Sequence, residues 1–536
     1  MCSYYRLMAR PVNDLNRVLT SKGYAIKKSY LTAEQTQIIR SELIMMPKVL
    51  DKFQHASSTF TIYYESKTRF YVPRHWGTVQ FGEPESNIVS EGQPLSDSIQ
   101  FRTTFPPRDF QRDIMTSFIE KGANGLICVP CGYGKTFMAL HLAVQLKRRF
   151  LIVVDKEFLM NQWKSEIENF IEGVTVGILQ GPTCQVGNTI IAGKERTVSE
   201  LKVLARQAGL PVGGTRDILV KRLEEAGIDT TPEKREVQYD VTICMIQTIC
   251  RQEFPDGFFE DYGFTIFDEC HHLGAAYFSQ ALQKIQTKYM LGLSATPDRE
   301  DGLSRVFEYY LGEAVYKKTQ REPDKEAIVK AIWFSSHDPA YEEVPLNWRG
   351  EPMTATLLNQ VANFEPRNQM ILDHLQSYAA DPNRFILLLS DRISQLEWFE
   401  KILEEKRYTW GYYVGGMKQS KLDENAEKCQ ILLATYQMAS EAFSVKKLNT
   451  VFLLTPRKRV EQSTGRIFRE RVEERKVAPH IIDILDSHDC HKRRWFIRKK
   501  FYKDCEYTIQ HINRPVKVVG NVQANEHGSL FQLSQT

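Results

Sequence analysis

The sequence predicts an α/β protein in which two doubly wound parallel-sheet domains follow one another along the chain. Short apolar runs alternate with helix-like segments and end in polar or Gly-rich turns, which is typical of buried parallel strands. The first set of runs is GLICV, FLIVV, VTICMI, GFTIFDE and KYMLGLSAT, and the second is AIVKAIWF, FILLLS, WGYYVGG, CQILLAT, TVFLLTP and HIIDIL. Two such sets in succession indicate two domains in tandem.

Length and composition are compatible with this fold. The chain of 536 residues can form three or four domains, and its 42% apolar and 25% charged content is ordinary for a globular protein. The net charge of +4 means that affinity for polyanions must come from local patches. Because no run of 18 apolar residues occurs and the first residues lack an apolar signal segment, we expect neither a membrane span nor secretion.

The ten cysteines are scattered, mostly in apolar runs. The CxxC formed by Cys128 and Cys131 has no second CxxC, so we interpret it as reduced core cysteine rather than a zinc site. The stretch SHDCHK (487–492) spaces its ligands too tightly for a tetrahedral site and predicts a surface loop. An intracellular, reducing compartment follows from this cysteine usage.

Changes in pattern along the chain predict the domain boundaries. The N-terminal segment is a small α+β domain, in which Thr32 and Gln35 form a capping box before a helix ending near Met46. The polar stretch REPDKEA separates the two α/β domains, and the polar tail is expected to be disordered. The expected order is N-terminal domain, first α/β domain, second α/β domain, basic aromatic element and tail, at 1–100, 101–320, 321–490, 491–514 and 515–536.

The stretch GLICVPCGYGKTFMALHLAVQL reads as strand, loop and helix, and it predicts a phosphate-binding loop. Gly132 and Gly134 let backbone N–H groups face phosphate, and the helix beginning at Lys135 adds its positive end. The Lys135 ammonium can reach the outer phosphates of ATP, and the Thr136 hydroxyl can ligate Mg²⁺. Val129 stands where the usual pattern has its first Gly. The expected loop is Pro130, Cys131, Gly132, Tyr133, Gly134, Lys135 and Thr136.

The stretch GFTIFDECHH supplies an acid pair at the carboxyl end of a strand, where ligands bind in open α/β sheets. Asp268 would hold Mg²⁺ through water, and Glu269 would polarise the attacking water as a general base. His271 and His272 either belong to this site or are surface histidines. Lys135 and Asp268 are 133 residues apart, and removing 193–236 leaves 89, a normal distance for three βα units. We therefore interpret 193–236 as an insertion into an intact ATPase domain.

The inserted segment resembles a SAP domain, a DNA-binding helix pair. TVSELKVLARQAG begins with a capping box of Thr197 and Glu200, GLPVGG is a turn, and Thr215 caps a second helix. Its exposed cations would contact DNA phosphates, so that the module tethers DNA to the motor on a flexible stalk. The alternative is a solvated face, since 197–227 carry five basic and four acidic side chains. The candidate DNA contacts are Arg216, Lys221 and Arg222.

Over roughly 103–490 the motifs resemble those of superfamily 2 helicases in type and order, which implies RecA-like domains. FPPRDFQRD resembles the adenine-side motif, with Arg108 stacking and Gln111 hydrogen-bonding. LSATPDRED contains an SAT motif, which in this family couples hydrolysis to strand movement, and EQSTGRIFR matches Q-x-x-G-R-x-x-R. The resemblance makes Arg466 and Arg469 arginine fingers at the γ-phosphate. The residues carried over from these two motifs are Ser294, Ala295, Thr296, Gln462, Arg466 and Arg469.

A finer resemblance is to the branch containing XPB, the phage helicase UvsW and the transcript-release helicases of poxviruses and other large DNA viruses. PDRED matches the Arg-Glu-Asp element of XPB and makes Arg299 a nucleic-acid contact, and FYVPRHWGTVQFG resembles the leading domain of the viral members. The fifth motif keeps Thr435, which would touch a phosphate of the bound strand, but has Ala442 and Ser444 where Gly and Asp are common. This departure leaves open how tightly hydrolysis is coupled to unwinding.

The segment HKRRWFIRKKFYK (491–503) carries seven Lys or Arg, no acid and four aromatic residues. Cations for the backbone and rings for base stacking suit a single strand. Alternatively, the segment is a helix that packs its aromatic residues on the second domain.

The leading hypothesis is therefore an ATP- and Mg²⁺-dependent DNA helicase or translocase, acting in viral transcription or in repair and recombination. The alternatives are an RNA helicase and a DNA-binding scaffold with a vestigial ATPase. The expected partners are single-stranded, duplex or branched DNA and the transcription machinery. We expect no membrane association, and we expect the protein to be a monomer. The expected site of action is a cytoplasmic viral factory, a virion or a nucleus.

Overall fold

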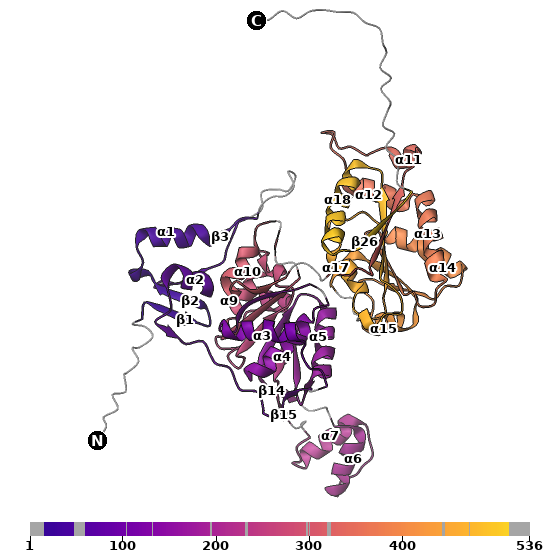
Figure 1. The fold of residues 1–536 in the computed structure, drawn as a ribbon. Coiled ribbons are helices and arrows are strands. Elements are labelled where there is room, and N and C mark those ends of the chain that lie inside the picture. Colours follow the sequence, from indigo (N-terminus) through magenta and orange to yellow (C-terminus); the bar gives the residue numbers. More distant parts are fainter. Residues whose placement is uncertain are drawn as a thin grey trace, which may run out of the picture. The chain divides into compact units, whose positions relative to one another are not determined.

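The chain forms two compact units, Met1–Arg321 and Glu322–Thr536, each built around a sheet covered by helices (Figure 1). No helix within the described part of the chain is long and apolar enough to cross a bilayer. The computed structural model describes residues 15–47, 59–102, 104–130, 132–192, 196–230, 234–295, 298–299, 301–318, 323–441, 445–470 and 472–513.

The first unit begins with a small α+β layer. Its sheet consists, in spatial order, of β5 (Tyr64–Glu65), β6 (Arg69–Val72), β2 (Gly23–Lys27), β1 (Arg17–Thr20) and β7 (Ser86–Asn87). Two helices accompany it, α1 (Ala33–Glu42) and α2 (Arg74–Phe81). The predicted capping box of α1 is present, because Thr32 and Gln35 each bind the backbone N–H of the other. The helix ends at Glu42 rather than near Met46, because Ile44–Met45 pairs as strand β3 with β4 (Phe60–Thr61).

One arginine fixes this layer to the ATPase fold. The buried Arg74 side chain donates to the backbone carbonyls of Thr287 (2.6 Å) and Lys288 (3.1 Å) and to the Asn124 side chain (3.2 Å). Burial lowers the pKa of Arg74 to about 10. A common apolar core also joins the two parts, so the N-terminal layer packs as part of the first unit.

The main sheet of the first unit consists, in spatial order, of β13 (Thr183–Cys184), β12 (Val176–Gln180), β16 (Val241–Met245), β10 (Phe150–Val154), β17 (Phe264–Phe267), β18 (Tyr289–Ser294), β9 (Asn124–Cys128) and β19 (Ala314–Lys317). All of them run parallel except β13. The central strands are buried along their whole length, as their apolar runs predict.

Helices cover both faces of this sheet. One face packs against α3 (Asp109–Glu120), α4 (Lys135–Leu146) and α5 (Glu157–Phe170). The other packs against α8 (Ile246–Arg251), the 3-10 turn η3 (Cys270–Gly274), α9 (Ser279–Lys284) and α10 (Ser304–Leu311). A short antiparallel pair, β8 (Gln100–Phe101) with β11 (Ile171–Glu172), lies outside the main sheet.

The insertion is a helix pair carried by a two-stranded ribbon. Strands β14 (Asn188–Ala192) and β15 (Lys234–Gln238) pair antiparallel, and between them lie α6 (Val198–Gln207) and α7 (Arg216–Glu225). The predicted stalk therefore contains hydrogen-bonded strands rather than only flexible chain. Thr197 and Glu200 form the predicted capping box, whereas the Thr215 side chain makes no cap bond. The two helices bury a core of their own, formed by Leu201, Ala205, Leu219 and Leu223.

The second unit contains one sheet of parallel strands. In spatial order they are β22 (Trp410–Tyr413), β23 (Ile431–Thr435), β21 (Ile386–Ser390), β24 (Thr450–Leu453), β25 (His480–Asp486), β20 (Ile328–Phe334) and β26 (Thr508–Ile512). Strand β26 was not predicted. The α helices of this unit are α11 (Pro339–Glu342), α12 (Thr354–Asn363), α13 (Glu365–Ala379), α14 (Ile393–Glu405), α15 (Gln419–Lys428), α16 (Tyr436–Glu441), α17 (Glu461–Thr464) and α18 (Asp489–Asp504).

The two main sheets have the same topology. With β13 set aside, the strand order β12-β16-β10-β17-β18-β9-β19 of the first unit corresponds strand by strand, in space and along the chain, to β22-β23-β21-β24-β25-β20-β26 of the second. The predicted fold class, two doubly wound parallel-sheet domains in tandem, is thus confirmed.

Two predictions about the C-terminal region were wrong. SHDCHK does not form a surface loop, because it leads into α18 and buries His488 and His491. The segment 491–514 is not a separate element either, because α18 and β26 complete the second sheet domain. No cluster of potential metal ligands occurs among the described residues.

Candidate ATPase site

The phosphate-binding loop lies between β9 and α4, at the carboxyl edge of the first sheet. Gly132 and Gly134 adopt the left-handed region, with φ of 88° and 79°, which turns successive N–H groups toward one side. A Cβ on Gly134 would meet the Gln111 amide nitrogen at 2.6 Å. The glycines thus leave the backbone open in front of the positive end of α4, as a phosphate group requires. Cys131 lies outside the described residues.

The adenine-side residues are joined to this loop. The buried Gln111 side chain accepts from the Arg108 backbone N–H (3.0 Å) and donates to the Tyr133 carbonyl (2.9 Å). Pro130 is buried, whereas the Arg108 side chain is exposed. A ligand that contacts Gln111 would therefore act directly on the position of the phosphate-binding loop, through the hydrogen bond to Tyr133.

The acid pair follows β17. Lys135 Nζ lies 3.4 Å from Glu269 Oε1, and both side chains are mostly buried. Trp163 Nε1 donates to Asp268 Oδ2 at 2.8 Å. Glu269 has a φ of 43°, which is strained for a residue with a side chain and directs it toward Lys135. The sequence pattern gave no indication of Trp163, which lies on α5, 105 residues before Asp268.

The electrostatics of the two carboxyl groups differ. Burial and the adjacent Glu269 charge raise the pKa of Asp268 to about 6. Burial also opposes the charge on Glu269, but Lys135 and the His271 hydrogen bond outweigh it and hold the Glu269 pKa below its usual value. Glu269 is thus ionised and can accept a proton from water. A hard divalent cation such as Mg²⁺ would relieve the repulsion between these two adjacent carboxylates, in keeping with the role expected of Asp268.

The two histidines of DECHH belong to the site rather than to the surface. His271 Nδ1 lies 3.1 Å from Ser294 Oγ and 3.3 Å from Glu269 Oε2. His272 Nδ1 lies 2.6 Å from the carboxylate of Asp155, which follows β10. His271 therefore connects the general-base candidate with the first residue of the SAT motif. Ala295 is buried beside it, and Thr296 lies outside the described residues.

Arg299, which is expected to contact nucleic acid, is held here by hydrogen bonds within the first unit. Its guanidinium donates to both carboxylate oxygens of Asp301 and to the backbone carbonyl of His271. Hydrogen bonding to Arg299 lowers the pKa of Asp301. The pair thus braces the backbone of the DECHH segment.

The motif residues of the second unit lie around one turn. Gln462 lies on α17, and Arg466 lies in the 3-10 turn η4 (Gly465–Ile467) that follows it. The buried Arg466 Nε donates to the Ala439 carbonyl of α16, the helix that follows Thr435. Thr435 ends β23 and accepts from the Met438 N–H at 3.4 Å. Arg469 follows Arg466 three residues later and is half-buried.

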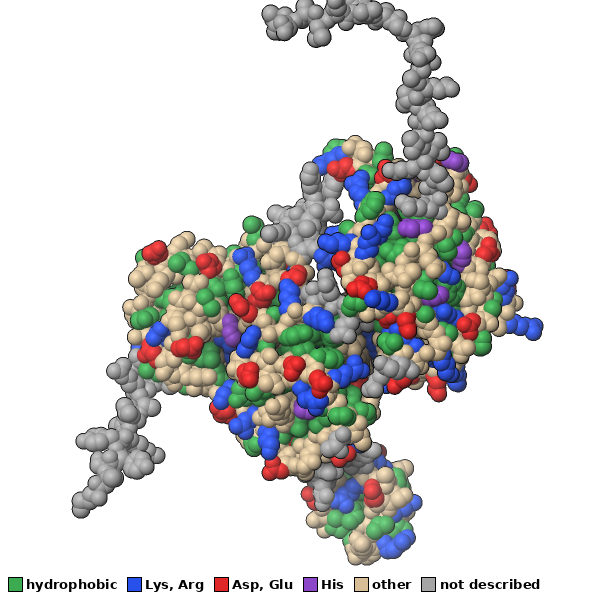
Figure 2. Space-filling view, viewed as in Figure 1, with side chains coloured by type: hydrophobic (Ala, Val, Ile, Leu, Met, Phe, Trp, Pro, Cys, Tyr) green, Lys and Arg blue, Asp and Glu red, His purple; other side chains and the backbone are tan. Residues whose placement is uncertain are grey.

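In the inserted module, the three candidate DNA contacts are not equivalent. Arg222 donates to the carbonyls of Pro211 and Gly213 and so braces the turn between the helices. Lys221 is exposed and lies 4.0 Å from Glu225, and Arg216 begins α7. Lys and Arg side chains are visible on the module in Figure 2. Arg222 thus stabilises the turn, and Lys221 keeps only a weak surface pair.

These arrangements define a class of protein, a nucleoside triphosphatase with two sheet domains of one topology. A family model described as the Type III restriction enzyme, res subunit, matches residues 104–299. The chain is 29% identical to "Putative ATP-dependent RNA helicase L396" of Acanthamoeba polyphaga mimivirus over 93% of this chain and 87% of that protein.

Two further relatives extend this comparison. "Putative helicase 161L" of Invertebrate iridescent virus 6 is 25% identical over 72% of this chain and 77% of its own length. "DNA 3'-5' translocase XPB2" of Sulfurisphaera tokodaii is 27% identical over 46% of this chain and 43% of its own. The chain thus contains a helicase-family domain and is similar over most of its length to helicases of large DNA viruses, which supports a superfamily 2 helicase with nucleic-acid-dependent ATPase activity.

Proposed function

We propose that this helicase acts on DNA, and that it couples ATP hydrolysis to translocation on DNA or to its unwinding. The observation that carries this proposal is the inserted helix pair, which has its own core and is joined to the ATPase domain by a paired ribbon. The similarity to a protein named as a DNA translocase supports it. An RNA helicase is the second candidate, because several relatives are named as such.

In the proposed mechanism, the loop residues and Lys135 bind the phosphates of ATP. Thr136 and Asp268 would hold Mg²⁺, which neutralises charge on the phosphates when it is bound. Glu269 accepts the proton of the attacking water, and Trp163 orients Asp268 through its indole N–H. Two further residues, Arg466 and Arg469, stabilise the charge that develops on the phosphoryl oxygens.

The inserted module, in this proposal, increases the local concentration of DNA at the motor. Arg216 and Lys221, both on α7, contact DNA phosphates. Arg222 stabilises the turn between the two helices. The contact is weak by itself because the module carries almost as many acids as bases. The module increases the overall affinity for DNA because it is linked to a second DNA-binding site on the same chain.

The biological setting proposed here is the transcription or the repair of a large viral DNA genome, in a viral factory, a virion or a nucleus. Relatives from mimivirus and an iridescent virus support this setting. All eight cysteines in the described ranges are unpaired, in keeping with a reducing compartment. We propose a monomer that works with the transcription machinery.

The first test compares ATP hydrolysis without nucleic acid and with single-stranded DNA, duplex DNA, a forked junction and RNA. Selective stimulation by DNA is expected. Stimulation by RNA alone would favour the second candidate. The absence of any stimulation, together with retained DNA binding, would favour a scaffold with a vestigial ATPase.

A second test isolates the inserted module. Residues 193–233 are replaced by an Asn-Gly turn, which closes β14 and β15 into a two-residue hairpin. We expect the DNA concentration for half-maximal ATPase to rise, with the maximal rate unchanged. An unchanged DNA concentration would contradict the tethering role.

A further inference from the structure

Helix α18 has two faces of different chemistry. Its buried face carries His491, Trp495, Arg498 and Tyr502. Arg498 binds both oxygens of the buried Asp483, at 2.8 and 2.9 Å, and the Tyr502 hydroxyl donates to the same carboxylate at 2.9 Å. These side chains fix the helix on the sheet and are closed to any ligand.

The opposite face combines cations with an exposed ring. Arg493, Phe496, Ile497 and Lys500 follow one another at helical spacing, and all four are exposed. The Phe496 side chain is 65% exposed, although an aromatic side chain of this size is normally buried on folding. Lys and Arg side chains gather over α18 in Figure 2. The exposed ring therefore lies in basic surroundings.

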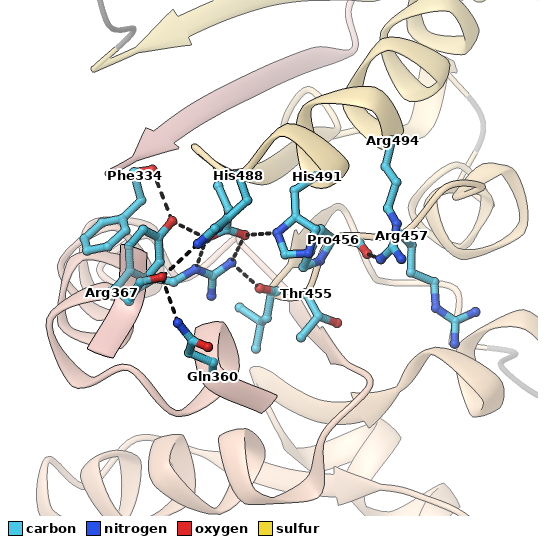
Figure 3. Close-up of polar contacts among 12 residues, drawn as sticks. Phe334, Gln360, Arg367, Thr455, Pro456, Arg457, His488, His491 and Arg494 are labelled. Carbon is cyan, nitrogen blue, oxygen red and sulfur yellow. Dashed lines mark hydrogen bonds and ion pairs between the residues drawn. The ribbon is translucent and has the colours of Figure 1, made fainter. Parts of the chain in front are cut away.

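This basic surface continues onto the loop that follows β24. Arg494 Nη1 donates to the Pro456 carbonyl at 2.8 Å (Figure 3), and Arg498 donates to the Arg457 carbonyl. Helix α18 and the loop are thus held side by side. The loop itself presents the exposed side chains of Lys458 and Arg459. Five cations that are exposed or half-buried thus lie on two adjoining segments: Arg493, Arg494, Lys500, Lys458 and Arg459.

We propose that this face of α18 binds a single strand of nucleic acid, with Phe496 stacking on an unpaired base and Arg493 and Lys500 contacting its phosphates. The inference rests on the proposed function, which supplies the strand. Cations spaced around one exposed ring match a polyanion whose bases are free to stack. A duplex offers no free base face to Phe496, so single strands are favoured over paired ones.

A second exposed ring in the same unit provides a matched control. The Trp348 side chain is 82% exposed in a tight turn closed by the Leu346–Pro352 bridge. Its neighbours along the chain include three acids, Glu342, Glu343 and Glu351, and only one cation, Arg349. Trp348 thus has an exposed ring with a single cation, Arg349, whose guanidinium lies 4.3 Å from the ring centroid, in place of the several cations around Phe496.

The experiment measures binding of the full chain to a labelled oligothymidine, to an abasic oligomer of equal length and to oligouridine, at several salt concentrations. Phe496→Ala should weaken oligothymidine binding roughly five- to tenfold and leave abasic binding unchanged, because it removes only a stacking partner. Phe496→Trp should retain the affinity. Lys500→Gln should weaken binding to both oligomers alike and reduce the salt slope by about 0.7. Trp348→Ala should change neither the affinity for the two oligomers nor the salt slope.

Equal binding of Phe496→Ala and wild type to oligothymidine would overturn the inference. A loss that is the same on the abasic oligomer would also overturn it, because the ring would then not stack on bases. If DNA still stimulates the ATPase in that case, the proposed function survives. A wild-type chain that binds no single strand would overturn the inference, and it would overturn the proposed function as well only if no form of DNA stimulates the ATPase. A Phe496→Ala loss confined to oligouridine would support the stacking surface and overturn the proposed preference for DNA.

Discussion

Each of the two sheet domains places an ion pair at the carboxyl edge of its sheet, and the two domains use it differently. In the first unit, α4 follows the strand β9 and brings Lys135 to Glu269 at 3.4 Å, with 12% and 15% of the two side chains exposed. In the second, α13 follows β20 after α11 and α12, and it brings Arg367 to Asp486, the last residue of β25, at 2.6 Å with neither side chain exposed. The first pair can be opened by a ligand, whereas the second is sealed.

The surroundings explain the difference. Around Asp486, the Tyr341 hydroxyl donates at 2.9 Å, Arg367 also donates to the Leu454 carbonyl, and His491 lies 3.9 Å away (Figure 3). In the first unit, two glycines keep the corresponding backbone open instead. Of two domains with one topology, only the domain that leaves its main-chain donors uncovered can bind phosphate.

The sealed pair should be the more costly to break. Arg367→Met leaves the Asp486 carboxylate buried without its cation, and we expect the second unit to lose about 3–5 kcal/mol of stability. Calorimetry of the full chain should show a transition shifted to lower temperature. The double variant Arg367→Met/Asp486→Leu removes both charges and should recover much of the loss. An unchanged transition in the single variant would show that the pair is not a structural lock.

The open pair should matter for chemistry instead. Lys135→Ala removes the cation expected at the outer phosphates, and we expect ATP hydrolysis to fall by about 10²–10³-fold. Its melting temperature should fall less than that of Arg367→Met, because the site remains accessible to water. Binding of DNA should persist. Hydrolysis within a few-fold of wild type would place the phosphate site elsewhere.

A pH dependence should also distinguish the sealed cluster. Burial, with help from Arg494 and Arg367, lowers the pKa of His491 from 6.5 to about 4, although Asp486 opposes this. In the unfolded chain His491 takes up a proton as the pH falls below 6.5, whereas in the folded chain it stays neutral until about pH 4. Stability is therefore complete above pH 6.5 and is lost toward pH 4, by up to roughly 3 kcal/mol for this group.

The test of this pH dependence is His491→Leu, which removes the proton uptake. We expect the melting temperature of the variant to fall less on acidification than that of wild type. Part of the acid loss should remain, because the pKa of His480 in the same unit is also lowered to about 4 by burial. Identical acid slopes in the two proteins would exclude His491 as a source.

The sequence predicts those parts of the molecule that depend on local pattern. Five strands of the first sheet and six of the second, the glycines of the phosphate loop and the DECHH segment were recognisable, because each depends on neighbours in the chain, whereas β12, β13, β19 and β26 were not predicted. The contacts of Arg367 were not, since its partner lies 119 residues away. A usable signal was present: Asp483 and Asp486 interrupt the apolar run HIIDILD, and a buried acid requires a partner.

The basic segment shows the same limit. Composition alone does not distinguish the residues of 491–503 from one another. In the helix, Trp495 and Arg498 are buried and Phe496 is exposed. Period 3.6 could have separated these sets, but the sequence gives no reason to choose which face is buried. That choice is made by Asp483, on a different element. Strand β26 was missed for a related reason, since TIQHI is short and half polar.

The smallest expected effect concerns the strand ends that correspond between the units, Ser294 after β18 and Asp486 after β25. Ser294 Oγ contacts His271 Nδ1 at 3.1 Å, a link between Glu269 and the SAT motif. We expect Ser294→Ala to leave ATP hydrolysis nearly intact and to weaken its coupling to strand separation by about 1 kcal/mol, the contribution of one hydrogen bond.

The readout for Ser294→Ala is the number of base pairs separated per ATP hydrolysed. Ser390→Ala is the matched control, because Ser390 is likewise a buried serine that ends a strand, and it binds Gln395 at 2.7 Å outside the ATPase site. Ser390→Ala also loses the bond that Ser390 Oγ accepts from the Arg392 N–H at 3.0 Å, so the control should lose at least as much stability as Ser294→Ala. Only Ser294→Ala should separate fewer base pairs per ATP. Equal ratios in the two variants would mean that the His271–Ser294 contact, like the Arg367–Asp486 pair, holds the fold and transmits nothing.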